Sequence, residues 1–283
     1  MAAQFFRNRT VLLVSMHQKE QAIAPPFEEA FGMQVFVSEG IDTDRLGTFS
    51  GEIPRAGTQL EAAQEKVRLG REKYPQAEII LASEGAFHPH PDSPFITINQ
   101  ELLLLHDFRL GLEISGSHGT LNNNAASLTS NSAHEILSFA TRAGFPETGI
   151  ILKTTDSSII HKNLLTPQEL GAVAETLLGL APGACIIAET DLRAHRNPLR
   201  MENIRMATKT LIGNMLSECP QCGIPGFSLS GRVPGLPCEA CGMPTHLPKD
   251  DIWLCRKCGG VEERKPSEGK EYCDPMYCDF CNP

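Results

Sequence analysis

Eight of the ten cysteines form four Cys-x-x-Cys pairs, and all four pairs lie in the last quarter of the chain. The pairs are Cys219 with Cys222, Cys238 with Cys241, Cys255 with Cys258, and Cys278 with Cys281. Structural zinc sites take four thiolates in a tetrahedron, and two such pairs supply one set of ligands. The four pairs therefore predict two structural zinc ions, whose binding provides the folding energy of this segment.

The spacing of the pairs leaves their partners open. The first two pairs enclose 15 residues and the last two enclose 19, and both intervals are typical of zinc ribbons. A cross-braced arrangement, in which the first pair joins the third, has the same composition. Gly223, Gly242 and Gly259 follow three of the pairs, where a positive φ lets the turn point backbone N–H groups at sulfur. Cys273 and His246 are expected to lie outside both sites, because the paired cysteines already complete them.

A further group of polar residues follows the last expected strand of the main domain, at the start of a helix. Arg193, Arg196 and Arg200 stand there. Positive charges at a helix N-terminus oppose the helix dipole, so an anion should compensate them. Asp191 and Glu202 are candidates within the chain, and a bound anionic ligand is the alternative.

These residues must be positioned by an α/β domain, predicted at 1–216, and by a double zinc-ribbon module, predicted at 217–283. Strand-like apolar runs occur at 9–16, 32–39, 77–87, 149–153 and 184–190. Helical patterns occur at 58–74, 132–145, 167–183 and 191–216, while two prolines allow only a short helix at 23–32. With a hairpin expected at 95–115, this alternation predicts a mixed sheet flanked by helices.

Two local features belong to the second expected helix and to the segment before it. Thr58 fits the N-cap position, and Glu61 completes a capping box three residues later. The polar, glycine-rich segment before this helix resembles a functional loop and carries Asp42, Asp44, Glu52 and Arg55.

The composition carries no sign of export or of a membrane span. The 283 residues have a formal net charge of −9 and a sequence pI of about 5.5. No window reaches the roughly 20 apolar residues that a membrane-spanning helix needs, and the first apolar run is too short for a signal peptide. We therefore expect a soluble, cytoplasmic protein whose cysteines bind metal, and the negative charge disfavours nucleic acid as a partner.

The cysteine-rich tail is acidic too. Residues 217–283 hold seven Lys or Arg against ten Asp or Glu, and each four-thiolate zinc site adds about two negative charges. Its large apolar residues Trp253 and Phe280 are expected to pack the ribbons together or onto the main domain. The tail is interpreted as a structural module or as a contact surface for a protein partner.

Four segments carry a resemblance over essentially the whole chain, namely GTFSGEIPR, ASEGAFHPHP, ETDLRAHRNPLRM and YCDFCNP. Together they resemble a family of uncharacterised bacterial proteins with zinc-ribbon C-termini. This resemblance implies a zinc-binding tail and no particular chemistry.

About 200 residues of the main domain are similar to the nucleoside triphosphate pyrophosphatases that remove inosine and xanthosine triphosphates. Those enzymes carry a phosphate-binding lysine after the first strand, where SMHQKE supplies Lys19. Their motif T-x-x-E-x-A-x-x-K corresponds to TQLEAAQEK, which contains Glu61 and Lys66. The acidic residue at the end of their next strand corresponds to Glu84.

The same enzymes place a His-Arg pair beside the base, and AHR supplies His195 and Arg196. The resemblance implies that this pair and the two lysines bind a nucleotide, while the two glutamates hold Mg²⁺ or act as the base for an attacking water. The chain departs from the pattern at His17, where those enzymes have asparagine, and in a shortened acidic motif.

Three hypotheses about function are left open. One is a Mg²⁺-dependent pyrophosphatase acting on non-standard nucleoside triphosphates. Another is a non-catalytic nucleotide- or anion-binding regulatory protein whose zinc ribbons contact a partner, which glutamates that fail to converge would favour. A third is a purely structural protein, favoured if all three arginines pair with protein carboxylates.

Overall fold

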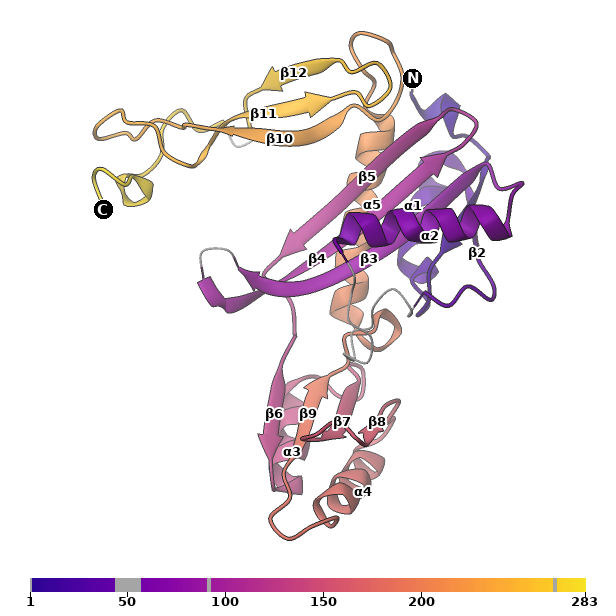
Figure 1. Cartoon of the computed structure of the whole chain (residues 1–283), viewed down its shortest axis with the longest axis vertical. Coiled ribbons are helices and arrows are strands. Elements are labelled where there is room, and N and C mark those ends of the chain that lie inside the picture. The colour runs from indigo at the N-terminus through magenta and orange to yellow at the C-terminus, as the bar shows by residue number, and fades with distance from the viewer. Residues whose placement is uncertain (1, 44–56, 91–92, 267–268) are drawn as a thin grey trace.

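The computed structural model describes residues 2–43, 57–90, 93–266 and 269–283 (Figure 1). Three sheets follow one another along the chain, with five α-helices among the described residues. Asp44, Glu52 and Arg55 of the expected functional loop lie outside the described residues. Within the described part of the chain, no helix combines the length and the apolar character needed to cross a membrane.

The first sheet has the strand order β2-β1-β3-β4-β5. Its strands are β1 (Thr10–Val14), β2 (Gln34–Val37), β3 (Ile79–His90), β4 (Ser93–Asp107) and β5 (Leu112–Thr120). Strand β1 runs parallel to β2 and β3, whereas β3, β4 and β5 are antiparallel. The predicted mixed sheet and the hairpin at its end are confirmed.

Helices cover both faces of this sheet. Ile79 and Leu81 of β3 pack with α1 (Glu20–Phe31) and α5 (Pro198–Leu216), while the intervening Ile80 packs with α2 (Gln59–Lys73) on the other face. This alternation follows from the two-residue period of a strand and explains the continuous apolar runs of the sequence.

Helix α1 starts earlier than its prolines suggested, and it contains both Pro25 and Pro26. Proline removes backbone donors but has a φ that is compatible with a helix. The buried side chains of Ile23, Phe27 and Phe31 hold α1 against the sheet, so tertiary packing offsets the lost hydrogen bonds.

The second sheet is antiparallel, with the order β6-β9-β7-β8. It consists of β6 (Ser127–Ser130), β7 (Ile150–Thr154), β8 (Ile160–His161) and β9 (Ile186–Thr190). Helices α3 (Ala133–Arg142) and α4 (Pro167–Leu178) complete a separate apolar core with it. The sequence predicted β7 and β9 as strands but did not separate them from the first sheet, because an apolar run does not identify its pairing partner.

A third sheet follows α5 and belongs to the cysteine-rich segment. It is antiparallel and contains β10 (Ser228–Pro234), β11 (Pro248–Leu254) and β12 (Val261–Arg264). In Figure 1 the ribbon of β10 and β11 extends from the end of α5, and the C-terminus lies beyond its far end. The predicted boundary between residues 216 and 217 falls where α5 ends, at Leu216.

Helix α5 approaches β5 closely at Gly116. A Cβ atom on Gly116 would lie 2.2 Å from the backbone nitrogen of Leu211 and 2.4 Å from its Cα. Backbone atoms of a buried helix cannot move aside as a side chain can, so this contact requires glycine.

We predict that Gly116→Ala lowers the free energy of unfolding by about 3 kcal/mol, because α5 must shift away from the sheet. Gly213→Ala in α5 is the control for an added methyl group, since a Cβ there meets nothing within 4 Å. The control should raise stability by up to about 1 kcal/mol through helix propensity. Urea denaturation of both variants measures this difference, and a Gly116→Ala protein as stable as wild type would contradict the close approach.

Candidate functional site

The eight paired cysteines form two groups, and within each group the four sulfur atoms lie within 4.8 Å of one another. The first group unites the first and third pairs, and the second unites the second and fourth. The groups are Cys219, Cys222, Cys255 and Cys258, and Cys238, Cys241, Cys278 and Cys281. The structure therefore selects the cross-braced pairing over the sequential one.

Sulfur–sulfur distances test whether zinc fits these groups. Between the pairs they are 3.7 and 3.7 Å in the first group, and 3.9 and 3.6 Å in the second. A tetrahedron with metal–sulfur bonds of about 2.3 Å has edges of about 3.8 Å. A disulfide would bring two sulfurs to about 2.05 Å, and all ten cysteines are free. Both groups therefore have the dimensions of a four-thiolate zinc site.

Tight turns hold each pair in place. The amides of Gly223, Gly242 and Gly259 donate to the carbonyl of the first cysteine of their pair, at 2.8, 2.9 and 2.9 Å. The three glycines have φ values of 69°, 72° and 76°, and an added Cβ on each would meet nothing within 4 Å. The left-handed backbone rather than a lack of space requires glycine here, as the sequence predicted.

Backbone amides also prepare the thiols for metal. Burial raises the pKa of Cys219, but the N–H groups of Cys222 and Gln221 favour the thiolate and bring that pKa down to about 7. The pKa of Cys281 is instead raised to about 12, mainly by the neighbouring sulfur of Cys241. Four thiolates so close together need a cation, and zinc binding would release the remaining protons.

The first group is docked on the main domain. Arg256 and Lys257 lie between Cys255 and Cys258 of this group. Nη1 of Arg256 lies 2.9 Å from Oε1 of Glu113 on β5, and Nζ of Lys257 donates to the carbonyl of Leu110 at 2.9 Å. The ring of Trp253 lies 5.9 Å from that of Phe227, and both pack beside Cys219 and Cys255 of the first group.

The second group lies at the other end of the β10–β11 ribbon. Buried Cys273 directs its sulfur to Oγ1 of Thr245 at 3.6 Å, and Nε2 of His246 lies 3.2 Å from Asp279. Among the described residues, the two cysteine groups do not include either residue. The expectation for Phe280 is wrong, because this residue is 73% exposed.

A second candidate site lies in the main domain, around the carbonyl of Ser83 at the end of the apolar part of β3. Nζ of Lys66 donates to this oxygen at 3.0 Å and lies 2.6 Å from Oε1 of Glu84. Nζ of Lys19 reaches the same oxygen and the Ser83 hydroxyl, both at 3.3 Å. Three of the predicted site residues, Lys19, Lys66 and Glu84, are thus brought together, and all three are buried.

Lys19 follows an unusual turn between β1 and α1. His17 and Gln18 both have left-handed backbone, with φ values of 68° and 57°. This conformation costs each non-glycine residue about 1–2 kcal/mol, so it persists only where the surrounding structure enforces it. The turn directs Lys19 into the protein interior.

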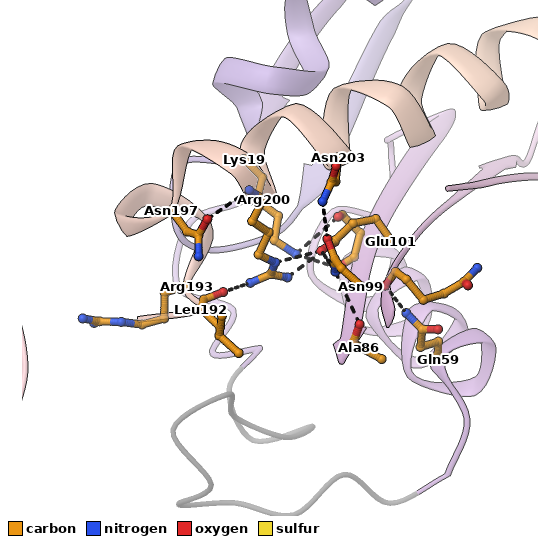
Figure 2. A network of polar contacts seen from close by, with 12 residues as sticks. Lys19, Gln59, Ala86, Asn99, Glu101, Leu192, Arg193, Asn197, Arg200 and Asn203 are labelled. Carbon is orange, nitrogen blue, oxygen red and sulfur yellow. Dashed lines mark hydrogen bonds and ion pairs between the residues drawn. The ribbon is translucent and has the colours of Figure 1, made fainter. Parts of the chain in front are cut away.

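Figure 2 shows a buried ion pair near Lys19, between Arg200 at the start of α5 and Glu101 on β4. Nε of Arg200 lies 2.8 Å from Oε1 of Glu101, and both side chains are at most 1% exposed. Arg200 also donates to the carbonyl of Leu192, and Asn99 donates to Glu101 at 2.9 Å. Glu101 was not among the predicted site residues, because a single glutamate in a strand-like run gives no local signal of its partner.

Burial, together with the neighbouring positive charges, changes the titration of Lys19. Burial, followed by the charges of Arg200 and Lys66, lowers the pKa of Lys19 from 10.5 to about 7. The site therefore contains three cationic side chains against the carboxylates of Glu84 and Glu101. An anion bound here would stabilise the protonated lysine.

Glu61 has a different role from the other predicted residues. Its Oε2 accepts from the backbone amide of Thr58 at 2.7 Å, and its own amide donates to the Thr58 hydroxyl at 3.2 Å. The predicted capping box is confirmed, and this contact lowers the pKa of Glu61. The carboxylate is used at the helix start rather than at Ser83.

His195 and Arg196 lie on the short helix η3 (Ala194–Arg196) between the two sheets. The ring of His195 stacks on that of His17 at 5.2 Å, which places it near the Lys19 turn. Burial, followed by the charge of Arg193, lowers the pKa of His195. Arg196 donates to the carbonyl of Leu164 at 2.8 Å. In the part of the chain that the structure describes, Nδ1 of His195 and Nε of Arg196 are buried without a hydrogen-bond partner.

Two of the three arginines at the start of α5 pair with carboxylates, but the third does not. Arg193 binds Asp191 at 2.6 Å, Arg200 binds Glu101, and Arg196 reaches only a carbonyl among the described residues. Glu202 pairs with Arg205 instead of compensating this cluster. The condition that favoured a purely structural role is not fully met.

A groove of about 440 Å³ opens between the first and second sheets. It is lined by β3, β4, β6 and β9 through residues that include Phe87, Thr97, Ser127 and Glu189. Leu192 also lines it, and the Leu192 carbonyl accepts from Arg200. The groove therefore adjoins the buried ion pair.

Comparison with known proteins gives one family. The family model described as a domain of unknown function (DUF6671) matches residues 71–283. The match includes both cysteine groups, Glu84, Glu101 and Arg200, and it begins after Lys19 and Lys66. No curated protein matches the chain.

Double substitutions test the cysteine pairing. Cys219→Ser with Cys255→Ser removes ligands from one group only, so the chain should retain about one zinc ion. Cys219→Ser with Cys238→Ser removes a ligand from each group and should leave almost none. Zinc per chain, measured by mass spectrometry of purified protein, distinguishes the pairings, because sequential ribbons would give the opposite pattern.

Proposed function

We propose that this chain, which belongs to the family described as a domain of unknown function (DUF6671), binds and hydrolyses a nucleoside triphosphate around Ser83, while its cysteine groups hold two structural zinc ions. The observation that carries the proposal is the meeting of buried Lys19 and Lys66 at the Ser83 carbonyl, beside Glu84. These are residues that the similarity to the inosine and xanthosine triphosphate pyrophosphatases implies for phosphate and metal.

The charge balance supports a ligand with several negative charges. Buried lysines are stabilised in their protonated form by an anion, and a polyphosphate provides oxygens for more than one cation. Lys19 and Lys66 both contact the Ser83 carbonyl, and phosphate oxygens could replace this contact, while Lys66 keeps its pairing with Glu84 and Arg200 its pairing with Glu101.

The neighbouring groove supports a nucleoside beside the phosphates. Phe87 offers an aromatic side chain there, and Glu189 and Thr190 offer hydrogen-bonding groups for a base or sugar. Nδ1 of His195, buried without a partner among the described residues, is a further candidate for a nucleotide contact. These features fit a ligand that carries both a ring system and phosphates.

Mg²⁺ fits this site only together with substrate. Outside the cysteine groups, the described residues offer no set of three metal ligands, but Mg²⁺ is usually held by one or two carboxylates and substrate phosphates. Glu84 would supply that carboxylate, and the ion would neutralise charge on the phosphates during the reaction. Attack of water on the α-phosphorus would break its bond to the bridging oxygen, giving a nucleoside monophosphate, pyrophosphate and a proton.

A non-catalytic nucleotide- or anion-binding protein is the second candidate. It is favoured by the position of Glu61, whose carboxylate caps α2, so that only one of the two implied catalytic glutamates stands beside the lysines. Binding of pyrophosphate without turnover of any nucleotide would select this alternative.

We predict that Lys19→Met weakens pyrophosphate binding at least about tenfold at pH 6, a loss of about 1.4 kcal/mol. The ratio of wild-type to Lys19→Met affinity should fall as pH rises through the Lys19 pKa of about 7, because the free lysine loses its charge. Lys209→Met on the exposed side of α5 is the matched control. Calorimetric titration with pyrophosphate measures both, and an unchanged affinity in Lys19→Met would remove Lys19 from the site.

The same substitution has a signature in stability. Since the pKa of Lys19 is lowered from 10.5 to about 7, the unfolded chain binds one more proton than the folded chain between these values. Wild-type stability should therefore gain from this residue as pH rises from 7 toward 10.5, and Lys19→Met should lack that gain.

Glu84→Gln should reduce Mg²⁺-dependent turnover at least about a hundredfold, because a neutral amide binds Mg²⁺ poorly. Glu61→Gln provides the comparison, since it alters a helix cap and should leave turnover within about threefold of wild type. Pyrophosphate release from inosine triphosphate, with and without Mg²⁺, measures both variants. Equal loss of turnover in the two variants would contradict the separate roles of Glu84 at the metal and Glu61 at the helix cap.

A further inference from the structure

The second cysteine group is surrounded by exposed apolar side chains. Met243, Tyr272, Met276, Tyr277 and Phe280 have exposed fractions of 49%, 56%, 59%, 51% and 73%. Large apolar groups exposed together on a protein surface mark sites of interaction. No other stretch of comparable length among the described residues carries five exposed large apolar side chains.

These side chains all belong to the segments that form the second cysteine group, here called the second centre, and the first cysteine group is called the first centre. Phe280 lies within the fourth cysteine pair, Met276 and Tyr277 directly precede that pair, and Met243 follows the second pair by two residues. The four sulfurs of the group lie within 4.8 Å of one another, and consecutive Cα atoms are about 3.8 Å apart. Tyr272 joins them because its neighbour Cys273 is buried against the same group.

These exposed side chains do not form the interior of the second centre. Its interior is a small cluster of Leu236, Cys238, Cys273 and Cys278. The first centre provides the contrast, since Phe227 and Trp253 pack there and Arg264 stacks over both rings. The first centre is therefore docked and internally packed, whereas the second leaves its aromatic and methionine side chains in solvent.

The charge around the second centre indicates what covers it. Residues 236–247 and 269–283 contain four acidic side chains, Glu239, Glu271, Asp274 and Asp279, against one lysine, Lys270. Four thiolates with one zinc ion add about two negative charges. Such a surface repels nucleic acid and attracts a basic protein segment.

We propose that the second centre is a docking surface for a basic segment of a partner protein, in which an apolar anchor is flanked by lysine or arginine. Methionine side chains adapt to an apolar anchor, and tyrosine and phenylalanine rings bind both apolar groups and cations. The β10–β11 ribbon extends away from the first sheet, and the C-terminus lies beyond its far end (Figure 1).

The test uses the zinc-loaded full chain and two fluorescent peptides of equal length. One places leucine and phenylalanine between lysine and arginine blocks, and the other replaces every basic residue with glutamate. Fluorescence anisotropy should show at least about tenfold tighter binding of the basic peptide, weakened by salt as expected for exposed charges. Tyr277→Ser with Phe280→Ser should lower that affinity at least about tenfold, with two zinc ions per chain retained.

Leu229→Ser is the matched control, because Leu229 is a 43% exposed apolar residue on β10, outside the second centre. It should bind the basic peptide as wild type does. Equal binding of the two peptides, or equal affinity in the Tyr277→Ser/Phe280→Ser variant, would overturn the proposal. Reversible dimerisation that this variant abolishes would also overturn it, by assigning the surface to a second copy of the chain. Nucleotide turnover should be unchanged in the variant, so failure here is distinguishable from failure of the proposed function.

Discussion

Buried positive charge is the constraint on which the main domain depends. A cation inside a protein costs free energy unless a partner offsets the loss of water. Arg200 meets Glu101 and Lys66 meets Glu84, while Lys19 hydrogen-bonds to Ser83 and keeps a lowered pKa. These residues come from the turn before α1 and from α2, β3, β4 and α5, so the packing of both faces of the first sheet converges on them. Apolar side chains in place of buried ion pairs often leave a protein equally or more stable, and the phosphate-bearing ligand that we propose would account for this arrangement.

The two cysteine groups have different relations to that domain. The first is joined to β5 through Arg256 and Glu113, and its aromatic residues are packed. The second has only a small interior of its own and exposes its large side chains. The β10–β11 ribbon links the two cysteine groups, because it starts beside one group and ends beside the other. Loss of the first metal should therefore disturb the attachment of the whole module, whereas loss of the second should disturb only its end.

The sequence predicted features whose cause is local. The ligand cysteines, the glycines of their turns and the Thr58–Glu61 capping box each depend on a few neighbouring residues. The pairing of the cysteines could not be predicted, because both pairings have acceptable spacing and the choice depends on how the ribbon folds. The partnership of Glu101 with Arg200 joins residues 99 positions apart. The position of Arg200 at a helix start marked it in the sequence, but nothing local marks Glu101. The hypothesis of a nucleotide-hydrolysing site named Lys19, Lys66 and Glu84, which meet in the structure, whereas Glu61 from the same hypothesis has a capping role. The outward position of Phe280 is a failure of the rule that large apolar residues are buried, at the surface where we infer a partner.

Pyrophosphate release by the full, zinc-loaded chain from a panel of nucleoside triphosphates, with and without Mg²⁺, tests the central claim most directly. The panel includes the inosine and xanthosine forms beside the common nucleotides. Our account predicts Mg²⁺-dependent formation of nucleoside monophosphate and pyrophosphate in equal amounts. The absence of turnover with every nucleotide, together with no binding of pyrophosphate, would contradict a phosphate site at Lys19, Lys66 and Glu84.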